Sequence, residues 1–232
     1  MVLGKAYLMN KDYIHAESAL QDALVKAKIL LGEHHDNYAE ILYLLGLLYD
    51  KVNNTAQSEN YFQQSLTAFE NLYSTQHPKY IATLNSLGEL YQKNQQYNKA
   101  KSCFQQVAQV TKDIFVSTTN YMSERQRGLF WETIRHRYET IYPTFTYESV
   151  ATDSTIAGFA YNNELFMKGL LLHSSATIHN SIMNSGDSIL IQQWEKLKLM
   201  NVQILALQEN DPTSSYLEEL KNDAEELEKQ FC

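Results

Sequence analysis

The feature that most constrains the fold of this chain is a segment that repeats itself after 42 residues. The stretch His35-Asp36-Asn37-Tyr38 aligns with His77-Pro78-Lys79-Tyr80 without a gap. The columns that follow in register are Leu42, Leu45, Gly46, Tyr49, Ser58 and Phe62, against Leu84, Leu87, Gly88, Tyr91, Ala100 and Phe104. The same register reaches back to Leu3, Gly4, Tyr7, Ala16 and Leu20. Such self-similarity indicates a stacked array, in which no unit buries its apolar face alone.

A glycine recurs at one position of this register, at Gly46 and Gly88. Glycine inside a helix costs about 1 kcal/mol relative to alanine, so its return predicts the close approach of a partner helix. No segment alternates apolar and polar residues with period 2 for long enough to indicate a strand. We therefore expect an all-α chain, with Phe62 and Phe104 in the core and the glutamines after them on the outer face.

These columns resemble the tetratricopeptide repeat, whose unit is a pair of antiparallel helices, A and B. A 42-residue unit that opens helix A with His-x-x-Tyr is similar to the longer variant in kinesin light chains and many bacterial scaffold proteins. The resemblance implies a right-handed superhelical array of antiparallel helix pairs, a solenoid, followed here by a helical extension. It also implies a protein that binds other proteins.

The register divides the chain into two regions. Residues 1–118 are expected to form the repeat array, and residues 119–232 a helical extension that ends in an antiparallel helical hairpin. If Gly4 is the glycine of the first helix A, that helix lacks its first turn and a half. We therefore expect residues 1–232 to be a piece of a longer protein or a truncated gene product.

Helix signals continue through the extension. The capping pattern Ser123-x-x-Gln126 predicts a helix that Pro143 stops, and a loop then leads to a long helix over about 154–184, ended by Gly186. Asp187 can cap the next helix, which runs to about residue 209. The closing helix carries Leu217, Leu220, Ala224 and Leu227 at alternating steps of three and four, a seam for an antiparallel neighbour.

The extension also resembles the linker of bacterial proteins that combine tetratricopeptide repeats with a caspase-like CHAT domain. The segments that carry this resemblance are Met122-Ser123-Glu124-Arg125 with Phe130-Trp131, Phe159-Ala160-Tyr161-Asn162-Asn163 with Lys168-Gly169-Leu170-Leu171-Leu172, and Asn184-Ser185-Gly186-Asp187-Ser188. In that family a protease domain with a catalytic His and Cys follows the hairpin, and no residue of this chain matches either motif. The resemblance implies a downstream CHAT domain that this array regulates.

Composition excludes several other classes of protein. The net charge of −8 leaves no basic footprint for nucleic acid. The longest nearly uninterrupted apolar run, 41–49, is too short to cross a membrane, and the N-terminus lacks a basic-then-apolar signal, so we expect a cytoplasmic protein. Two cysteines give no disulfide framework.

No set of side chains in the sequence converges on a catalytic or metal site. Cys103 occupies a helix-packing column, and Cys232 has no local partner. The pair His34-His35 suggests a metal, but His35 recurs as His77, which favours a role at a helix N-terminus. A zinc site needs three or four convergent ligands. We therefore expect no cofactor, no metal and no enzymatic activity in this chain.

What remains is binding of a peptide or protein partner. In tetratricopeptide arrays helix A lines the inner surface, and counting from Gly46 and Gly88 gives the inward positions. We expect the partner-binding residues to be Tyr43, Leu47, Asp50, Asn85, Glu89, Gln92 and Lys93. Packing against the helical extension is an alternative role for Leu44 and Leu47. The leading hypothesis is the sensor arm of a CHAT protease, and the alternative is a stand-alone peptide-binding adaptor.

Overall fold

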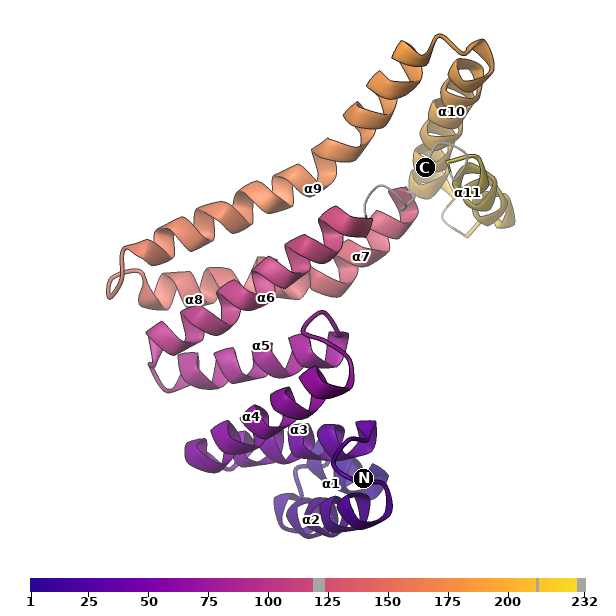
Figure 1. Cartoon of the computed structure of the whole chain (residues 1–232). Helices are drawn as coiled ribbons and strands as arrows, with labels where there is room; N and C mark the ends of the chain where they lie inside the picture. The colour runs from indigo at the N-terminus through magenta and orange to yellow at the C-terminus, as the bar shows by residue number, and fades with distance from the viewer. Residues whose placement is uncertain (119–123, 212, 229–232) are drawn as a thin grey trace. The chain divides into compact units, whose positions relative to one another are not determined.

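The computed structural model describes residues 1–118, 124–211 and 213–228, and within this part of the chain every regular element is helical. The predicted all-α array is confirmed, and Figure 1 shows the helices following one another as antiparallel pairs from the N-terminus. The repeat region consists of α1 (Val2–Met9), α2 (Tyr13–Leu30), α3 (Asp36–Lys51), α4 (Thr55–Leu72), α5 (Pro78–Lys93) and α6 (Tyr97–Thr118).

Side chains cap these helices in a way that follows the 42-residue register. Asp12 and Asn54 each accept a hydrogen bond from the backbone N–H three residues on, at the starts of α2 and α4. His35 and His77 cap α3 and α5 through Nδ1, which accepts from the N–H two residues on. Each cap satisfies a backbone donor that a helix N-terminus otherwise leaves unpaired. The repeated histidines therefore serve the starts of the helices.

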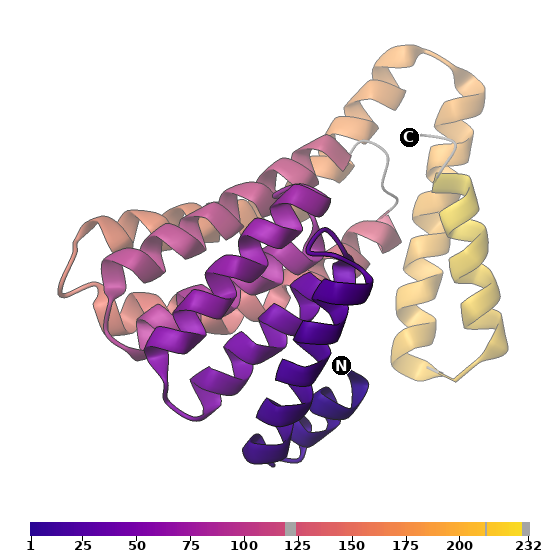
Figure 2. The same ribbon diagram turned by 60° about the horizontal axis from the view of Figure 1, so that its bottom comes forward.

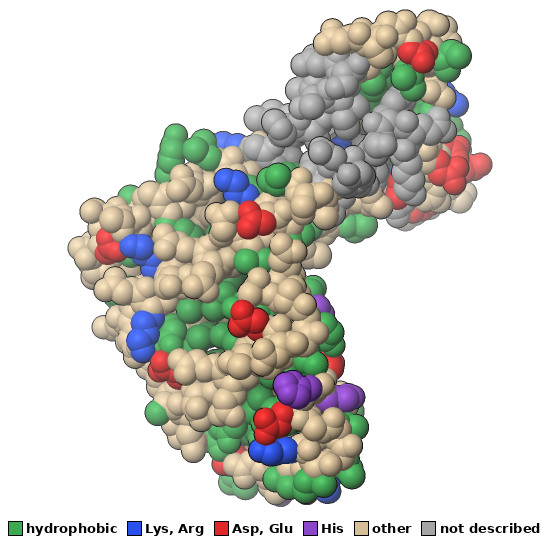
Figure 3. All heavy atoms as spheres, viewed as in Figure 1, with side chains coloured by type: hydrophobic (Ala, Val, Ile, Leu, Met, Phe, Trp, Pro, Cys, Tyr) green, Lys and Arg blue, Asp and Glu red, His purple; other side chains and the backbone are tan. Residues whose placement is uncertain are grey.

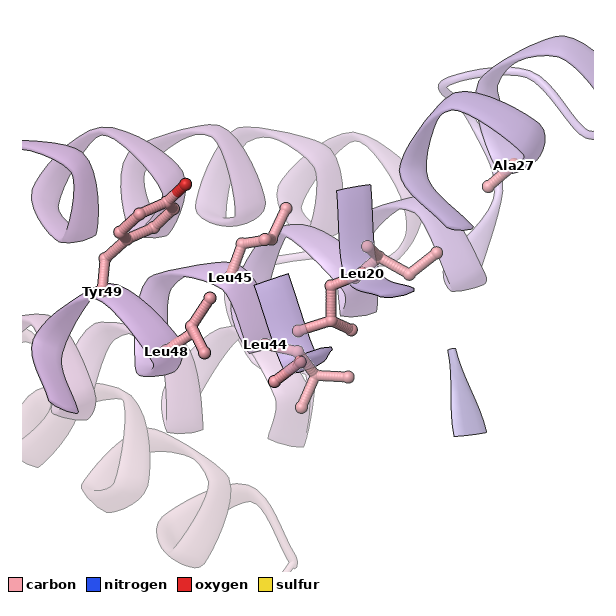
Figure 4. Packing of buried hydrophobic residues seen from close by; sticks show 8 residues of the cluster. Leu20, Ala27, Leu44, Leu45, Leu48 and Tyr49 are labelled. Atoms are coloured by element: carbon pink, nitrogen blue, oxygen red, sulfur yellow. The ribbon is translucent and has the colours of Figure 1, made fainter. Parts of the chain in front are cut away.

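The core of each repeat forms where helix A crosses helix B. A Cβ added to Gly46 would lie 2.5 Å from Phe62 Cδ1, and one added to Gly88 would lie 2.6 Å from Phe104 Cε1. Both phenylalanines are buried, while Gln63 and Gln105, beside them in sequence, are exposed. The first core cluster joins α2 to α3 through Leu20, Ala27, Leu44, Leu45, Leu48 and Tyr49, among others (Figure 4).

Contacts divide the chain into two compact units, each described here by itself. Unit 1 comprises residues 1–113 and 145–156, and unit 2 comprises residues 114–144 and 157–232. The division expected from the sequence, at residue 118, stays a prediction, and these units divide the chain at other points. The remaining elements are α7 (Glu124–His136), the π-helix η2 (Arg137–Ile141), α8 (Tyr142–Ser149), α9 (Thr155–Ser185), α10 (Ser188–Asn210) and α11 (Ser215–Glu228).

The prediction that Pro143 stops a helix is wrong. The chain stays helical through Pro143, because the π-helix η2 precedes it and α8 continues to Ser149. In this wide turn the N–H of Tyr142 donates to the carbonyl of Arg137, five residues back. Proline lacks an N–H and its ring clashes with the carbonyl four residues back in a regular α-helix, and a π-turn changes that spacing. Ser123, the expected cap of α7, lies outside the described residues.

The last two helices of unit 2 pack on each other, as Figure 2 shows. Asp187 caps α10 by accepting from the N–H groups of Ile189 and Leu190. The interface buries Trp194, Leu197 and Met200 of α10 against Leu220 and Ala224 of α11. Leu217 is buried as well, so three of the four residues of the expected seam lie in the core, and Leu227 packs at its edge.

Candidate partner-binding face

Successive A helices, α3 and α5, touch at points spaced seven residues apart. Lys79 Nζ lies 2.6 Å from Asp36 Oδ2, the hydroxyls of Tyr43 and Ser86 lie 3.4 Å apart, and Lys93 Nζ lies 2.9 Å from Asp50 Oδ1. Each pair joins residues that are 43 positions apart, one more than the repeat length. Seven residues are about two helical turns, so the three contacts lie along one side of each helix. Of the sequence-predicted residues, Tyr43, Asp50 and Lys93 make these contacts, and Glu89 and Gln92 lie beside Lys93 on α5. We call this set of residues the A-helix face.

Several predicted residues already bond a neighbouring helix. Asp50 is half-buried and pairs with Lys93, whose ammonium also donates to the Asp50 carbonyl at 3.1 Å. Tyr43 is half-buried, with its ring 5.9 Å from that of Phe62. Leu47 is partly buried against the first core cluster, and Leu44 is buried within it. Leu44 therefore belongs to the core of the repeats themselves, while Leu47 keeps part of its surface in solvent.

Asn85 is buried, with 8% of its surface exposed. Its Nδ2 donates to Glu89 Oε1 at 2.5 Å. Its Oδ1 is also buried and has no hydrogen-bond partner among the residues that the structure describes. Buried polar atoms in proteins are nearly always hydrogen-bonded, so an unpaired amide oxygen is an unusual feature.

The A-helix face continues onto α8, which the sequence analysis did not anticipate. Gln92 Nε2 donates to Glu148 Oε2 at 2.8 Å, and both residues belong to unit 1. The adjacent Tyr147 is 87% exposed. Both α8 residues lie in the segment that was expected to be a loop after Pro143. Helix-compatible residues at positions 142–149 could have indicated this helix, but Pro143 is the stronger signal for a helix end.

Charge pairing at one end of the face shifts the pKa values of the groups involved. Burial raises the pKa of Asp36, but hydrogen bonds from Lys79 and Tyr73 outweigh it, so the pKa is lowered. Burial lowers the pKa of Lys79, and its bonds to Asp36 and Glu40 raise it overall. The pair is therefore charged at neutral pH and fixes the start of α5 against α3. This end of the face is a structural contact, and Glu89 and Lys93 are the exposed charges of the face on α5.

The candidate nucleophile Cys103 lies in the packing column where the sequence placed it. Burial raises the pKa of its thiol to about 11, so the reactive thiolate is scarce at neutral pH. Cys232 lies outside the described residues. Among the described residues no group of three His, Cys, Asp or Glu side chains is placed to hold a metal ion. None of the described helices is long and apolar enough to cross a membrane.

Comparison with known proteins gives a family for the first half of the chain. The tetratricopeptide repeat family model matches residues 1–71 and 53–113. The structure of BtubC (BKLC) from P. vanneervenii is similar over 97% of this chain and 77% of that one, at 15% identity and a TM-score of 0.50. Two structures of kinesin light chain TPR-like repeats from Podosopora anserina each cover 98% of this chain and 92% of their own. Their identities are 14% and 16%, with TM-scores of 0.47 and 0.45.

No curated protein matches the sequence. The likeness to BtubC, at its low identity, bears on the fold alone. The family match, by contrast, covers the helices that carry the 42-residue register and the A-helix face. Residues 1–113 of this chain therefore match the tetratricopeptide repeat.

Proposed function

We propose that this chain is a protein-interaction scaffold that binds a peptide or protein segment along the A-helix face. Tetratricopeptide repeats are generally non-catalytic scaffolds for protein binding. The observation that carries the proposal is Asn85, whose buried amide oxygen has no partner among the described residues. An asparagine offers both a donor and an acceptor, the pair of groups that a peptide backbone needs. A bound backbone N–H would satisfy that oxygen once the side chain turns toward it.

The charges of the face favour a partner that carries both signs. Glu89 and Lys93 are exposed and one turn apart on α5. Asp50 and Gln92 border them, and each is already held by one contact that a partner could share or exchange. The exposed Tyr147 adds an aromatic surface beside Glu148. We therefore expect a polar peptide with at least one aromatic or aliphatic side chain, read through its backbone and its charges.

Peptide selection tests this assignment. A random peptide library displayed against the purified chain should yield binders, and their affinity for Glu89→Lys and Lys93→Glu should fall at least about tenfold, because each change reverses one charge beside the backbone contact. The matched control is Gln105→Lys, an equally exposed position on the outer side of α6. Binders that are insensitive to both α5 changes but lost in the control variant would contradict the assignment.

The stability of the variants separates binding from folding. Lys93→Glu breaks the ion pair with Asp50, but that pair is half exposed, and such pairs contribute at most about 1 kcal/mol. Glu89→Lys loses the bond from Asn85 and should cost a similar amount. Both variants should therefore keep the helical circular dichroism of the original chain and melt within a few degrees of it.

A finer proposal is that the array is the sensor arm of a CHAT-type protease. Its support is the set of sequence segments in the extension that resemble the linker of such proteins, including Phe159 to Asn163 and Asn184 to Ser188. The comparisons with known proteins name tetratricopeptide repeats and no CHAT protein. The alternative is a stand-alone adaptor, for which the matched repeats alone are sufficient.

One experiment distinguishes the sensor arm of a protease from a stand-alone adaptor. The 232-residue chain should cleave no peptide substrate, and a version extended through the coding sequence that follows Cys232 should show thiol-dependent cleavage. Cleavage by the chain alone that disappears with Cys103→Ala would contradict the assignment of Cys103 to the core. An extended version without a caspase-like domain would leave the adaptor as the function.

A further inference from the structure

The contact between α5 and α8 repeats a contact that the A helices make with each other. Near the end of α3, Asp50 bonds Lys93 of α5. The residue of α5 that lies 42 positions after Asp50 is Gln92, and its Nε2 donates to Glu148 Oε2 of α8 at 2.8 Å. Glu148 therefore takes the place beside α5 that Lys93 takes beside α3.

The packing of α8 on α6 agrees with this assignment. Helices α2 and α4 each carry a glutamate that accepts a hydrogen bond from a tyrosine of the next A helix. The counterpart of these glutamates on α6 is Lys101, which bonds Asp153, four residues after α8 ends. The ring of the buried Phe145 also lies 5.1 Å from that of Phe104 in the core of α6. Within unit 1, residues 145–153 thus cover α6 as an A helix covers the B helix before it.

This equivalence gives α8 a position on the A-helix face. Because Glu148 takes the place of Lys93, the residue before it, Tyr147, takes the place of Gln92 and of Asp50 in the earlier repeats. The side chain of Tyr147 is 87% exposed. The face therefore continues from α3 and α5 onto residues 145–149 of α8, where it presents an aromatic ring and a carboxylate. Tyrosine is among the residues that contribute most to binding in protein interfaces.

The charge of α8 at this contact differs from that of the earlier helices. Lys79 and Lys93 of α5 pair with carboxylates of α3 at distances of 2.6 to 2.9 Å. Several acidic side chains lie next to basic ones on the side of the molecule that Figure 3 shows. Glu148, by contrast, accepts from the uncharged amide of Gln92, and no lysine or arginine of the described residues forms an ion pair with it. The exposed carboxylate of Glu148 is thus available to a cation of the partner.

From the repeat-like position of α8, its exposed ring and its carboxylate, we propose that Tyr147 and Glu148 bind an arginine or lysine side chain of the partner. The cationic group pairs with the carboxylate of Glu148, and the ring of Tyr147 attracts the same cation through its π-face. The two residues are consecutive, so one long side chain can reach both. This inference rests on the proposed function and specifies it, because it places a basic residue at the α8 end of the bound segment.

Peptides selected from the random library against the full chain test this inference. Peptides that bind the A-helix face should share an arginine or lysine, and its replacement by glutamine should weaken binding at least about tenfold. Glu148→Gln should weaken binding by a similar factor, yet its amide oxygen can still accept from Gln92. In the Glu148→Gln variant, replacing the basic residue of the peptide should have little further effect. Such non-additivity identifies the two groups as partners.

Variants of the ring and a matched carboxylate make the outcome specific. Tyr147→Phe keeps an aromatic ring and should keep the affinity, while Tyr147→Leu should weaken binding several-fold, because leucine has no π-face for the cation. Glu70→Gln makes the same change as Glu148→Gln at an exposed position on the B helix α4 and should leave binding unchanged. All of these side chains are exposed, so each variant should keep the circular dichroism and melting temperature of the original chain.

The possible failures separate this inference from the proposed function. Peptides that respond to Glu89→Lys and Lys93→Glu, but contain no basic residue or bind Glu148→Gln equally well, would overturn the inference and leave the proposed function in place. An equal loss in Glu70→Gln and Glu148→Gln would show a general attraction of basic peptides to an acidic chain, and would overturn it too. A library without binders, or binders insensitive to all of these changes, would contradict both.

Discussion

Gly46 and Gly88 show how single residues determine the distance between the helices of a repeat. Each faces the ring of a buried phenylalanine so closely that a methyl group would lie 2.6 Å or less from a ring carbon. The cost of glycine within a helix is offset by this close packing, which the sequence could predict because the glycine returns in register. The residue that pairs with each glycine was also in a repeating column, at Phe62 and Phe104.

A glycine-to-alanine series tests this account at the residue scale. Gly46→Ala should lower the free energy of unfolding by about 1–3 kcal/mol, because the aromatic ring must shift. Gly158→Ala is the matched control, since a Cβ added to that helical glycine meets no atom within 4 Å beyond its own helix backbone and chain neighbours. Alanine there should stabilise by about 0.5–1 kcal/mol. Thermal and denaturant unfolding measure both changes. Equal losses at the two positions would mean that the close approach is not what the glycine provides.

The binding residues were harder to predict than the core. The register pointed to one side of each A helix, which stays a prediction, and it could not show that Asp50 and Lys93 bond each other or that Asn85 is buried. Those outcomes depend on the angle at which α5 packs on α3, and the periodicity of a single helix does not predict that angle. The contact at a separation of 43 residues follows from that packing and is visible only in three dimensions.

At the scale of elements, the turns inside each repeat share a strained residue. Lys11, Asn53 and Gln95 have φ values of 60°, 57° and 58°, and they are 42 residues apart. Each follows helix A and precedes the cap of helix B. A left-handed conformation is costly for most residues and better tolerated by asparagine. The turn geometry is thus part of the repeat, even though the residue that adopts it differs between units.

Glycine substitution in these turns should stabilise the array unequally. Gln95→Gly removes the clash of the side chain in the left-handed region and should raise the free energy of unfolding by up to about 1 kcal/mol. Asn53→Gly should change it by much less, because asparagine already tolerates this conformation. Chemical denaturation of both variants gives the comparison. A loss of stability in Gln95→Gly would show that the side chain contributes more than the backbone strain costs.

The connection between α8 and α9 is held to α6 by an ion pair that responds to acid. Lys101 Nζ lies 2.7 Å from Asp153 Oδ2, and Thr155 donates to Asp153 Oδ1 through its hydroxyl and its N–H. These bonds lower the pKa of Asp153 from 3.8 to about 2. A lowered pKa stabilises the fold at pH values above 3.8, and this stabilisation is lost as the pH falls toward 2.

The pH dependence of unfolding tests that pair. The original chain should lose stability between pH 4 and pH 2 more steeply than Asp153→Asn, which cannot titrate at this position. Lys101→Met should make stability depend less on pH over the same range, because it removes the hydrogen bond that is the largest cause of the lowered pKa of Asp153. Melting temperatures measured by circular dichroism across this range are sufficient. Parallel curves for all three proteins would show that the pair does not couple α6 to the connection.

Helix α8 shows why part of the second half could not be predicted. Proline is a strong signal for the end of a helix, and the sequence around Pro143 gives no sign of a π-turn. The π-turn forms where Tyr138 and Tyr142 are buried, with ring centroids 5.1 Å apart. Tertiary packing of aromatic side chains thus overrides the local preference. For this reason the sequence did not predict that α8 contacts α5, where Gln92 donates to Glu148.

At the scale of the whole chain, the evidence for function is concentrated in unit 1. This unit holds the matched repeats and the A-helix face with Asn85. Unit 2 contains the packed pair α10 and α11. The repeat array was predictable because the same contacts between helices recur every 42 residues and require the same residue types at the same positions. The helices of the extension do not repeat. Its sequence therefore indicated where helices begin and end, but no second unit could be aligned with it to identify core positions.

Hydrogen–deuterium exchange tests the central claim, that partners bind along the A-helix face. A peptide selected from a random library is added to the chain at saturating concentration, and amide exchange is compared with that of the free chain. Exchange should slow in residues 36–51 and 78–93, which form α3 and α5, with little change in residues 55–72 of α4. Slowing confined to α4, α6 or the pair α10 and α11 would contradict the claim and place the binding surface elsewhere.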